Sequence, residues 1–406
     1  MRKKIVISKM FLVILFIAIL MVLIFHFLDI SHFSFVIKSP AQIEVVQEKT
    51  PQRLANPPQI IKGIYLTAYT AADPKRVDEL IDLIKKTELN AVVIDVKDYS
   101  GYVLFDTQSD FIKKFGTEKV IIKNLGDLIK KFHDNQIYTI ARITVFQDPA
   151  LVKSRPDLAV KNKLTGGVWQ DNKRLSWLDP AAPEVWNYIF VVAKAAMRLG
   201  FDELNFDYIR FPSDGSLENM GFPFYDGHTP KNEVIKSFFE YLSKNLRPWG
   251  IKISADMFGL VTVNQGDLGI GQSLEDAILY FDYICPMVYP SHYANGFIGY
   301  QNPAAYPYEV IKYSLDIAAK RLINFKNKKL QENATSTLQF AQLRPWLQSF
   351  DLGSIYDANM IKKEKKAVYD SLCPSEDKNR NDCSFYNGWI LWDPKNLYIS
   401  QSLETQ

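Results

Sequence analysis

Cysteine is scarce in this chain, with 3 cysteines among 406 residues. So few cysteines exclude a fold that is built on disulfides. Cys285 lies within an apolar run, and we expect it to be a small core residue rather than a reactive thiol. Cys373 and Cys383 instead flank a polar segment, which they could close as a short disulfide loop in an oxidising compartment.

Histidine is also rare, with 5 residues in the whole chain. His133, His228 and His292 are scattered and lack the spacing of metal ligands, which disfavours a metal-dependent deacetylase. The segment 377–382 resembles the first half of a calcium loop but has no turn glycine, so a solvated polar loop is the simpler interpretation. We therefore predict no metal site and no cofactor.

The chain has no large excess of charge of either sign. It carries 48 Lys and Arg residues against 45 Asp and Glu residues, and four of the basic residues lie within the first nine positions. The rest of the chain is therefore nearly neutral. A duplex nucleic-acid binder needs a clustered basic surface that displaces counterions from phosphates, so this class of protein is set aside.

Long apolar runs are absent except for one near the N-terminus. Residues 10–25 are wholly apolar and follow basic residues, and the run is at the lower limit of length for a spanning helix. We predict a cytoplasmic segment over 1–9, a single-pass transmembrane anchor over 10–28 with the body outside the cell membrane, and a proline-containing linker over 29–60. A cleaved signal peptide is the alternative, but no small-x-small site follows the run.

The Gly-x-Gly-x-x-Gly signature of dinucleotide-binding folds is missing after the first expected strand. From Lys62 onward the chain instead alternates short β-branched and aromatic runs with amphipathic segments, a pattern typical of parallel strands covered by helices. Eight strands are expected, at 63–68, 91–97, 138–146, 203–209, 252–258, 283–289, 342–348 and 388–392.

Amphipathic segments between these strands complete the pattern. Asp73 and Pro74 provide an N-cap and a first helical residue, and apolar residues follow at helical spacing. The count of strands and a body of about 345 residues predict an α/β protein in which one (β/α)8 TIM barrel fills residues 61–406. A doubly wound open sheet is the alternative. The other helices are expected at 125–133, 185–199, 234–246, 274–279 and 308–323.

Polar side chains gather where the expected strands end, and in a barrel these ends meet at one mouth. On the fourth strand, alternation places Asn205 and Asp207 on the face opposite Leu204 and Phe206, so Asp207 should point into the mouth. The fifth strand delivers a second carboxylate, Asp256, beside it. Other side chains expected at this mouth are Asp95, Lys97, Asp98, Arg142, Arg210, Tyr289, Arg344, Trp346, Gln348, Trp392 and Asp393.

Two carboxylates on neighbouring strand ends suit glycosidic cleavage, because one can protonate the leaving oxygen while the other attacks the anomeric carbon or activates water. The alternative is that Asp207 and Asp256 only neutralise Arg142 or Arg210 inside the barrel. Aromatic side chains can stack on the apolar faces of sugars, and many follow the expected strands. They are Tyr65, Tyr69, Tyr99, Phe146, Trp169, Trp177, Phe211, Tyr289, Tyr293, Trp346 and Trp392.

Five segments carry a resemblance to a known family. They are 90–98 (NAVVIDVKD), 205–212 (NFDYIRFP), 254–259 (SADMFG), 285–290 (CPMVYP) and 388–392 (GWILW). In this order they resemble the bacterial TIM-barrel proteins that are classed by similarity as glycoside hydrolases, distant relatives of the α-amylase-like retaining barrels. The resemblance covers roughly residues 60–400. It implies a nucleophile at the end of the fourth strand, Asp207, and an acid/base at the end of the fifth, Asp256.

We therefore expect a membrane-tethered, extracytoplasmic glycoside hydrolase whose partner is a polysaccharide or oligosaccharide at the cell surface. Asp207 would be the nucleophile, or the base if the reaction inverts, and Asp256 the general acid/base. A catalytically inactive carbohydrate-binding barrel is the main alternative, and a transglycosylase would use the same residues. Arg142 and Arg210 would keep Asp207 ionised, and the substrate-binding side chains would be Asp95, Lys97, Arg142, Asn205, Arg210, Tyr289, Trp346 and Trp392.

Overall fold

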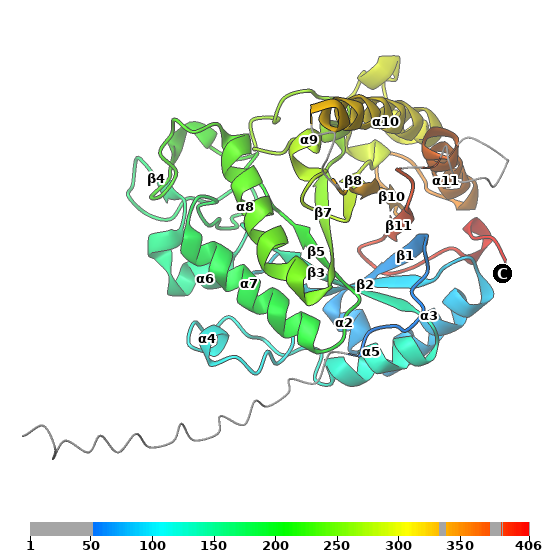
Figure 1. Ribbon diagram of the computed structural model, residues 1–406, viewed down its shortest axis with the longest axis horizontal. Helices are drawn as coiled ribbons and strands as arrows, with labels where there is room; N and C mark the ends of the chain where they lie inside the picture. The colour runs from blue at the N-terminus through cyan, green and yellow to red at the C-terminus, as the bar shows by residue number, and fades with distance from the viewer. Residues whose placement is uncertain (1–51, 333–337, 374–382, 384, 406) are drawn as a thin grey trace, which may run out of the picture. The chain divides into compact units, whose positions relative to one another are not determined.

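A closed barrel of parallel strands forms the centre of the molecule (Figure 1). The computed structural model describes residues 52–332, 338–373, 383 and 385–405. β10 pairs with both β8 and β11, which closes the ring, so the predicted TIM barrel is confirmed and the open sheet is excluded. The strands are β1 (Ile61–Leu66), β2 (Ala91–Lys97), β3 (Tyr138–Thr144), β5 (Glu203–Asp207), β7 (Lys252–Phe258), β8 (Tyr283–Met287), β9 (Gln342–Leu343), β10 (Trp346–Gln348) and β11 (Gly388–Trp392).

The seventh predicted strand, 342–348, is divided in the structure. β9 pairs with β8, whereas β10 pairs mainly with β11, and Arg344 and Pro345 stand between them. Proline has no N–H group to donate to a strand ladder, which accounts for the interruption. The two pieces together occupy one strand position, so the eightfold count is unchanged.

Helices surround the strands, as the amphipathic spacing predicts (Figure 1). In α3 the four apolar residues at helical spacing are all buried, and the Asp73 carboxylate caps the backbone N–H groups of Lys75 and Arg76. One long helix was not predicted: α11 buries Glu364 and Lys365, and these charged residues interrupt its apolar stripe. The helices are α3 (Pro74–Lys86), α5 (Leu125–Asp134), α7 (Pro183–Arg198), α8 (Lys231–Leu246), α9 (Leu274–Ala277), α10 (Pro307–Glu332) and α11 (Ala358–Leu372).

Short elements hold the loops on the mouth side of the barrel. The two long irregular stretches after β3 and β5 are joined by an antiparallel pair, β4 (Lys161–Asn162) with β6 (Met220–Gly221). Buried tryptophans in the first stretch add to this connection, since the Trp169 indole donates to the Ser216 carbonyl at 3.0 Å. Both stretches are thus fixed to each other above the barrel. The remaining short helices are α2 (Ala68–Ala71), α4 (Asp110–Lys113) and α6 (Pro149–Ser154).

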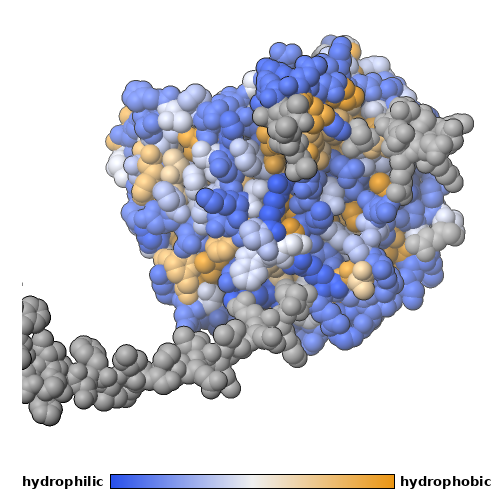
Figure 2. Space-filling model, in the orientation of Figure 1, coloured by the Kyte–Doolittle hydropathy of each residue, from blue (hydrophilic) through white to orange (hydrophobic). Residues whose placement is uncertain are grey.

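The apolar residues form two cores. The larger one lies between the strands and the helices, and the smaller one lies inside the barrel and includes Tyr65, Val93, Ile140 and Ile390. Cys285 belongs to the inner core, is fully buried and carries a free thiol, which confirms the prediction of a core residue. The outer surface is mainly hydrophilic with small, separate apolar patches on the face shown in Figure 2.

Cys373 and Cys383 form a disulfide, with their Cα atoms 4.4 Å apart, as the sequence suggested. The end of the predicted linker already packs on the barrel: the Leu54 N–H donates to Asp202 at 2.7 Å, and Arg53 donates to the Gly250 carbonyl at 2.7 Å. Both contacts lie at the end of the barrel where the strands begin.

The predicted anchor at 10–28 and the partial calcium motif at 377–382 lie outside the described residues. Within the described part of the chain, no helix combines the length and the apolar character that crossing a membrane requires. The anchor therefore stays a prediction.

Candidate active site

Strand register brings the predicted polar residues into one layer. Asp95 on β2 is paired with Arg142 on β3, and Arg142 is paired with Asn205 on β5. The pairing of β5 with β7 runs up to Phe206 and Ala255, so Asp207 and Asp256 are the next residues on two adjacent strands. Neighbouring strands lie about 4.8 Å apart. The two predicted catalytic carboxylates are therefore side by side.

Arg142 is at the centre of the charged cluster at the mouth. Its Nη1 lies 2.6 Å from Asp95 Oδ1, its Nη2 forms an ion pair with Asp207 Oδ2, and its Nε lies 3.5 Å from Asp256 Oδ2. One guanidinium is thus shared by three acidic side chains, and all four groups are largely shielded from solvent. A single positive charge cannot neutralise three carboxylates, which favours retention of a proton by at least one of them.

Asp256 is the acid that burial favours for the proton. Its Oδ1 accepts hydrogen bonds from Asn205 Nδ2 at 2.8 Å and from Trp346 Nε1 at 2.7 Å. Its Oδ2 has no hydrogen-bond partner among the described residues. Burial, reinforced by the charge of Asp207, raises the pKa of Asp256 to about 8, against the opposing influence of Arg142. Asp256 is therefore protonated at neutral pH.

Asp207 has a different environment from that of Asp256. Its Oδ2 pairs with Arg142 and its Oδ1 accepts the backbone N–H of Tyr208, so both oxygens have donors. Tyr208 has a φ of 54°, a left-handed conformation that turns the chain out of the strand directly after Asp207. The side chain of Asp207 is 7% exposed, compared with 1% for Asp256. Two neighbouring acids thus have unequal surroundings.

Asp95 is the third acid of the cluster. Its Oδ1 faces Arg142, and its Oδ2 accepts a hydrogen bond from the Tyr65 hydroxyl. Burial raises the pKa of Asp95, while Arg142 and Tyr65 act in the opposite direction. Asp95 therefore fixes one side of the Arg142 guanidinium.

Aromatic side chains cover the cluster on the side of β8, β10 and β11. Tyr289 stacks on Trp392 at 5.3 Å between ring centroids, and Trp392 also contacts Phe350 at 4.9 Å and Tyr65 at 6.3 Å. Burial, together with Asp256 and Asp207, raises the pKa of the Tyr289 hydroxyl well above its usual value. Phe350 was missed from the sequence, although it follows the predicted strand end at 348 by two residues.

The other predicted aromatic residues divide into two groups. Tyr69 and Tyr99 are exposed after β1 and β2, at 60% and 59%, and are available to stack on a sugar. The remaining residues are buried in the core and have no surface available for a sugar. These buried residues are Phe146, Trp169, Trp177, Phe211 and Tyr293.

The structure does not bring Lys97 to the mouth. A register shift between Asp95 and Lys97 breaks the alternation of β2, so the two side chains do not share a face. Lys97 is fully buried, its Nζ lies 2.9 Å from Asp148 Oδ2, and it donates to the Thr144 carbonyl at 2.8 Å. The structure thus shows Lys97 in a buried ion pair, and its contact with substrate stays a prediction.

Arg210 also has a role different from the predicted one. It donates to the Phe211 carbonyl at 3.0 Å and to the Ser213 hydroxyl at 3.2 Å, and its guanidinium lies over the rings of Trp177 and Phe258. Among the described residues, Arg142 and not Arg210 forms the ion pair with Asp207. Tyr208, two residues before Arg210, has a left-handed conformation that turns the chain out of the strand.

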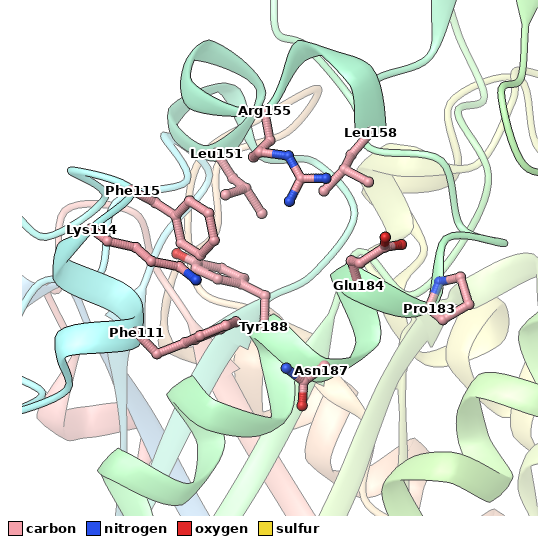
Figure 3. Close-up of a pocket in the computed structure, with 10 residues that line it drawn as sticks. All are labelled: Phe111, Lys114, Phe115, Leu151, Arg155, Leu158, Pro183, Glu184, Asn187 and Tyr188. Carbon is pink, nitrogen blue, oxygen red and sulfur yellow. The ribbon is translucent and has the colours of Figure 1, made fainter.

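A separate cavity of about 380 Å³ lies on the flank of the barrel between α4, α6 and α7 (Figure 3). None of the mouth residues lines it. The residues that line the cavity are Phe111, Lys114, Phe115, Leu151, Arg155, Leu158, Pro183, Glu184, Asn187 and Tyr188.

Among the described residues, no group of three or more His, Cys, Asp or Glu side chains is arranged to hold a metal ion.

Comparisons with known proteins agree with the barrel fold. A family model described as "Putative glycosyl hydrolase domain" matches residues 63–398. No curated protein matches the chain. A hypothetical protein from Ruminiclostridium thermocellum is 39% identical over 48% of this chain and 96% of its own, with a TM-score of 0.44. The PgaB (BpsB) glycoside hydrolase domain from Bordetella bronchiseptica is 12% identical, covers 86% of this chain and 99% of its own, and has a TM-score of 0.54, a likeness of fold.

Proposed function

This chain belongs to the family of glycosyl hydrolase domains whose model it matches, and on that premise we propose that its barrel mouth cleaves a polysaccharide with Asp256 as general acid and Asp207 as nucleophile or base. The observation that carries the proposal is the unequal environment of the two neighbouring acids. One has donors on both oxygens, and the other holds a proton at neutral pH. Glycosidic cleavage needs one acid in each state.

The proposed reaction uses this difference directly. Asp256 transfers its proton to the glycosidic oxygen as the bond between that oxygen and the anomeric carbon breaks. Asp207 either attacks the anomeric carbon or removes a proton from the water that attacks it, according to whether configuration is retained or inverted. If Asp207 has attacked, water then breaks the bond between Asp207 and the anomeric carbon and gives its proton to Asp256. If Asp207 has acted as base, it releases the proton of the water to solvent, and Asp256 takes one up from solvent. In both courses water supplies OH to one product and H to the other.

The surrounding side chains support these roles. Arg142 forms ion pairs with Asp207 and with Asp95, and the Tyr65 hydroxyl donates a hydrogen bond to Asp95. Trp392 is only partly buried, and with Tyr289 it presents a stacked aromatic pair beside the acids. The exposed Tyr69 and Tyr99 would extend the contact along a longer glycan.

The test is release of reducing ends from a panel of bacterial surface polysaccharides by the full chain and by its Asp207→Asn variant. We expect the wild type to cleave at least one polymer and the variant to lose roughly 10⁴-fold in rate. Asp316→Asn is a matched control, because Asp316 is an acid on α10 that pairs with Lys312. Equal activity of wild type and Asp207→Asn would refute the assignment. Glycan binding without cleavage by either protein would favour the inactive carbohydrate-binding barrel.

We also propose that the enzyme works outside the cytoplasm, held to the cell membrane by residues 10–28. The apolar run and the basic residues before it support this location. The bond between Cys373 and Cys383 supports it independently, because structural disulfides persist mainly in oxidising compartments. Protease added to intact cells should digest the body, and its protection until the cells are lysed would overturn the proposal.

A further inference from the structure

Two residues that the sequence marked as substrate-binding contact Asp256 instead. Asn205 is 1% exposed and Trp346 is 2% exposed, so neither offers surface to a sugar. Both donate to the same oxygen of Asp256, at 2.8 and 2.7 Å. Asn205 Nδ2 also donates to the Ser254 hydroxyl at 2.9 Å, which ties the amide to β7. These contacts arise from three strand positions, β5, β7 and β10.

The two oxygens of Asp256 therefore differ in chemistry. Oδ1 already accepts two N–H groups, and a proton placed there would compete with both donors. Oδ2 has no hydrogen-bond partner among the described residues and lies 3.5 Å from Arg142 Nε, whose guanidinium also contacts Asp207. Oδ1 thus faces Asn205 and Trp346. Oδ2 faces the Arg142 guanidinium, which Asp256 shares with Asp207.

We propose that Asn205 and Trp346 are positioning residues that hold Asp256 Oδ1 and thereby place the transferable proton on Oδ2, on the side of Asp207. The inference rests on the proposed function, in which Asp256 donates that proton to the leaving oxygen. Removal of either donor frees the carboxyl group to rotate and lets the proton occupy Oδ1. The proton would then face away from the Arg142 guanidinium and from Asp207.

The positioning role has a signature that a structural or substrate-binding role lacks. A donor to a carboxylate favours the ionised form, so its loss should raise the pKa of Asp256 further. The same loss should lower kcat, because the proton is no longer held in the productive direction. A residue that only bound sugar would instead change KM and leave the pKa of Asp256 unaltered.

The experiment compares the full chain with Trp346→Phe and with Trp389→Phe as a matched control. Trp389 is a buried tryptophan on β11 whose indole donates to the Tyr369 hydroxyl at 3.2 Å, in the outer core. Infrared difference spectroscopy follows the carboxyl titration, and reducing-end release from a polymer that the wild type cleaves gives kcat and KM. Asn205→Ala is the second variant, which keeps the test open if Trp346→Phe does not fold.

We expect Trp346→Phe and Asn205→Ala to move the Asp256 midpoint upward by roughly one pH unit and to lower kcat roughly 10-fold, with KM and the Trp389→Phe control nearly unchanged. An unmoved or lowered midpoint would overturn the inference, and a raised KM with an unmoved midpoint would return both residues to substrate binding. If the wild type cleaves nothing, the proposed function fails, while the titration still decides the positioning of the proton.

Discussion

The two ends of β5 carry acids on the same face of the strand, and each acid meets an arginine inside the barrel. At the start of the strand, Glu203 forms a two-pronged ion pair with Arg344, with Nη–Oε distances of 2.9 and 3.1 Å, and both side chains are fully buried. At its end, Asp207 shares Arg142 with Asp95 and Asp256. The first pair is balanced in charge, and the second cluster has acids in excess.

Under the proposed function, this difference separates a structural ion pair from a reactive cluster. Arg344 has further partners in the Asn387 side chain at 3.0 Å and in the Tyr283 ring, whose centroid is 4.0 Å away, so its charge is well compensated. In the cluster at the mouth, the surplus of acids and the bare Oδ2 of Asp256 leave a proton that can be given away. Both ends of the strand bury an acid, so the proposed role of Asp256 rests on the excess of acids at the mouth and not on burial alone.

The largest expected effects come from removing an acid from the cluster at the mouth and from the ion pair at the start of β5. Asp256→Asn should lower the rate of polymer cleavage roughly 10²- to 10⁴-fold, because it removes the proton that the proposed reaction transfers to the leaving oxygen. Its thermal and denaturant unfolding should resemble those of the wild type at acidic pH, since an amide replaces a neutral carboxyl. Retained activity in this variant would show that the proton comes from another residue.

Unlike Asp256→Asn, Glu203→Gln should lower stability and leave activity nearly unchanged. It leaves Arg344 buried without its counter-charge, which costs about 3 to 5 kcal/mol of folding free energy. The rate per folded molecule should stay within roughly two-fold, because Glu203 lies at the far end of the strand. Urea unfolding and active-site activity measured on the same sample separate the two effects. A large loss of activity in a fully folded sample would contradict the division of roles.

Arg142→Lys tests the geometry of the cluster at the mouth, because it keeps the positive charge and changes the shape of the group that carries it. An ammonium group cannot contact Asp95, Asp207 and Asp256 together as the planar guanidinium does. We expect kcat to fall roughly 10- to 100-fold through misplacement of Asp207, with only a small change in stability. The equivalent change at the balanced end, Arg344→Lys, should instead affect stability more than activity. The reverse pattern would contradict this account.

The last expected effect is a dependence of stability on pH. The pKa of Asp256 is raised to about 8 from its ordinary 3.8, so the folded protein keeps a proton that the unfolded chain releases above pH 4. The resulting stabilisation is complete below pH 4 and is lost as pH rises to about 8. We expect the free energy of unfolding of the wild type to fall with rising pH over this range, and that of Asp256→Asn to lack this component. A parallel pH dependence of the two proteins would contradict the shift.

The sequence predicted the barrel well because alternation and amphipathic spacing are local properties. The strand ranges at 91–97, 252–258 and 388–392 match β2, β7 and β11, and the ends of β5 and β7 place Asp207 and Asp256 side by side as predicted. The contacts of single side chains were harder to predict. Lys97 pairs with Asp148, and Arg210 donates to the Phe211 carbonyl, and neither contact follows from the strand pattern.

Partners across the barrel could not be predicted from periodicity. The donors on Asp256 come from β5 and β10, and the three acids on Arg142 come from β2, β5 and β7. Such contacts depend on which side chains the closed ring brings together at one height. The raised pKa of Asp256 follows from its burial among those contacts, and it could not be derived from two aspartates in a sequence.

The most direct test of the central claim is an infrared titration of the carboxyl groups of the full chain from about pH 5 to about pH 10, compared with Asp256→Asn and Glu203→Gln. We expect the infrared signal of a protonated carboxyl group to be lost with a midpoint at about pH 8 in the wild type and in Glu203→Gln. This signal should be missing from Asp256→Asn. A wild type with no carboxyl titrating above about pH 6, or a titration that persists in Asp256→Asn, would contradict the claim that Asp256 stores the proton for catalysis.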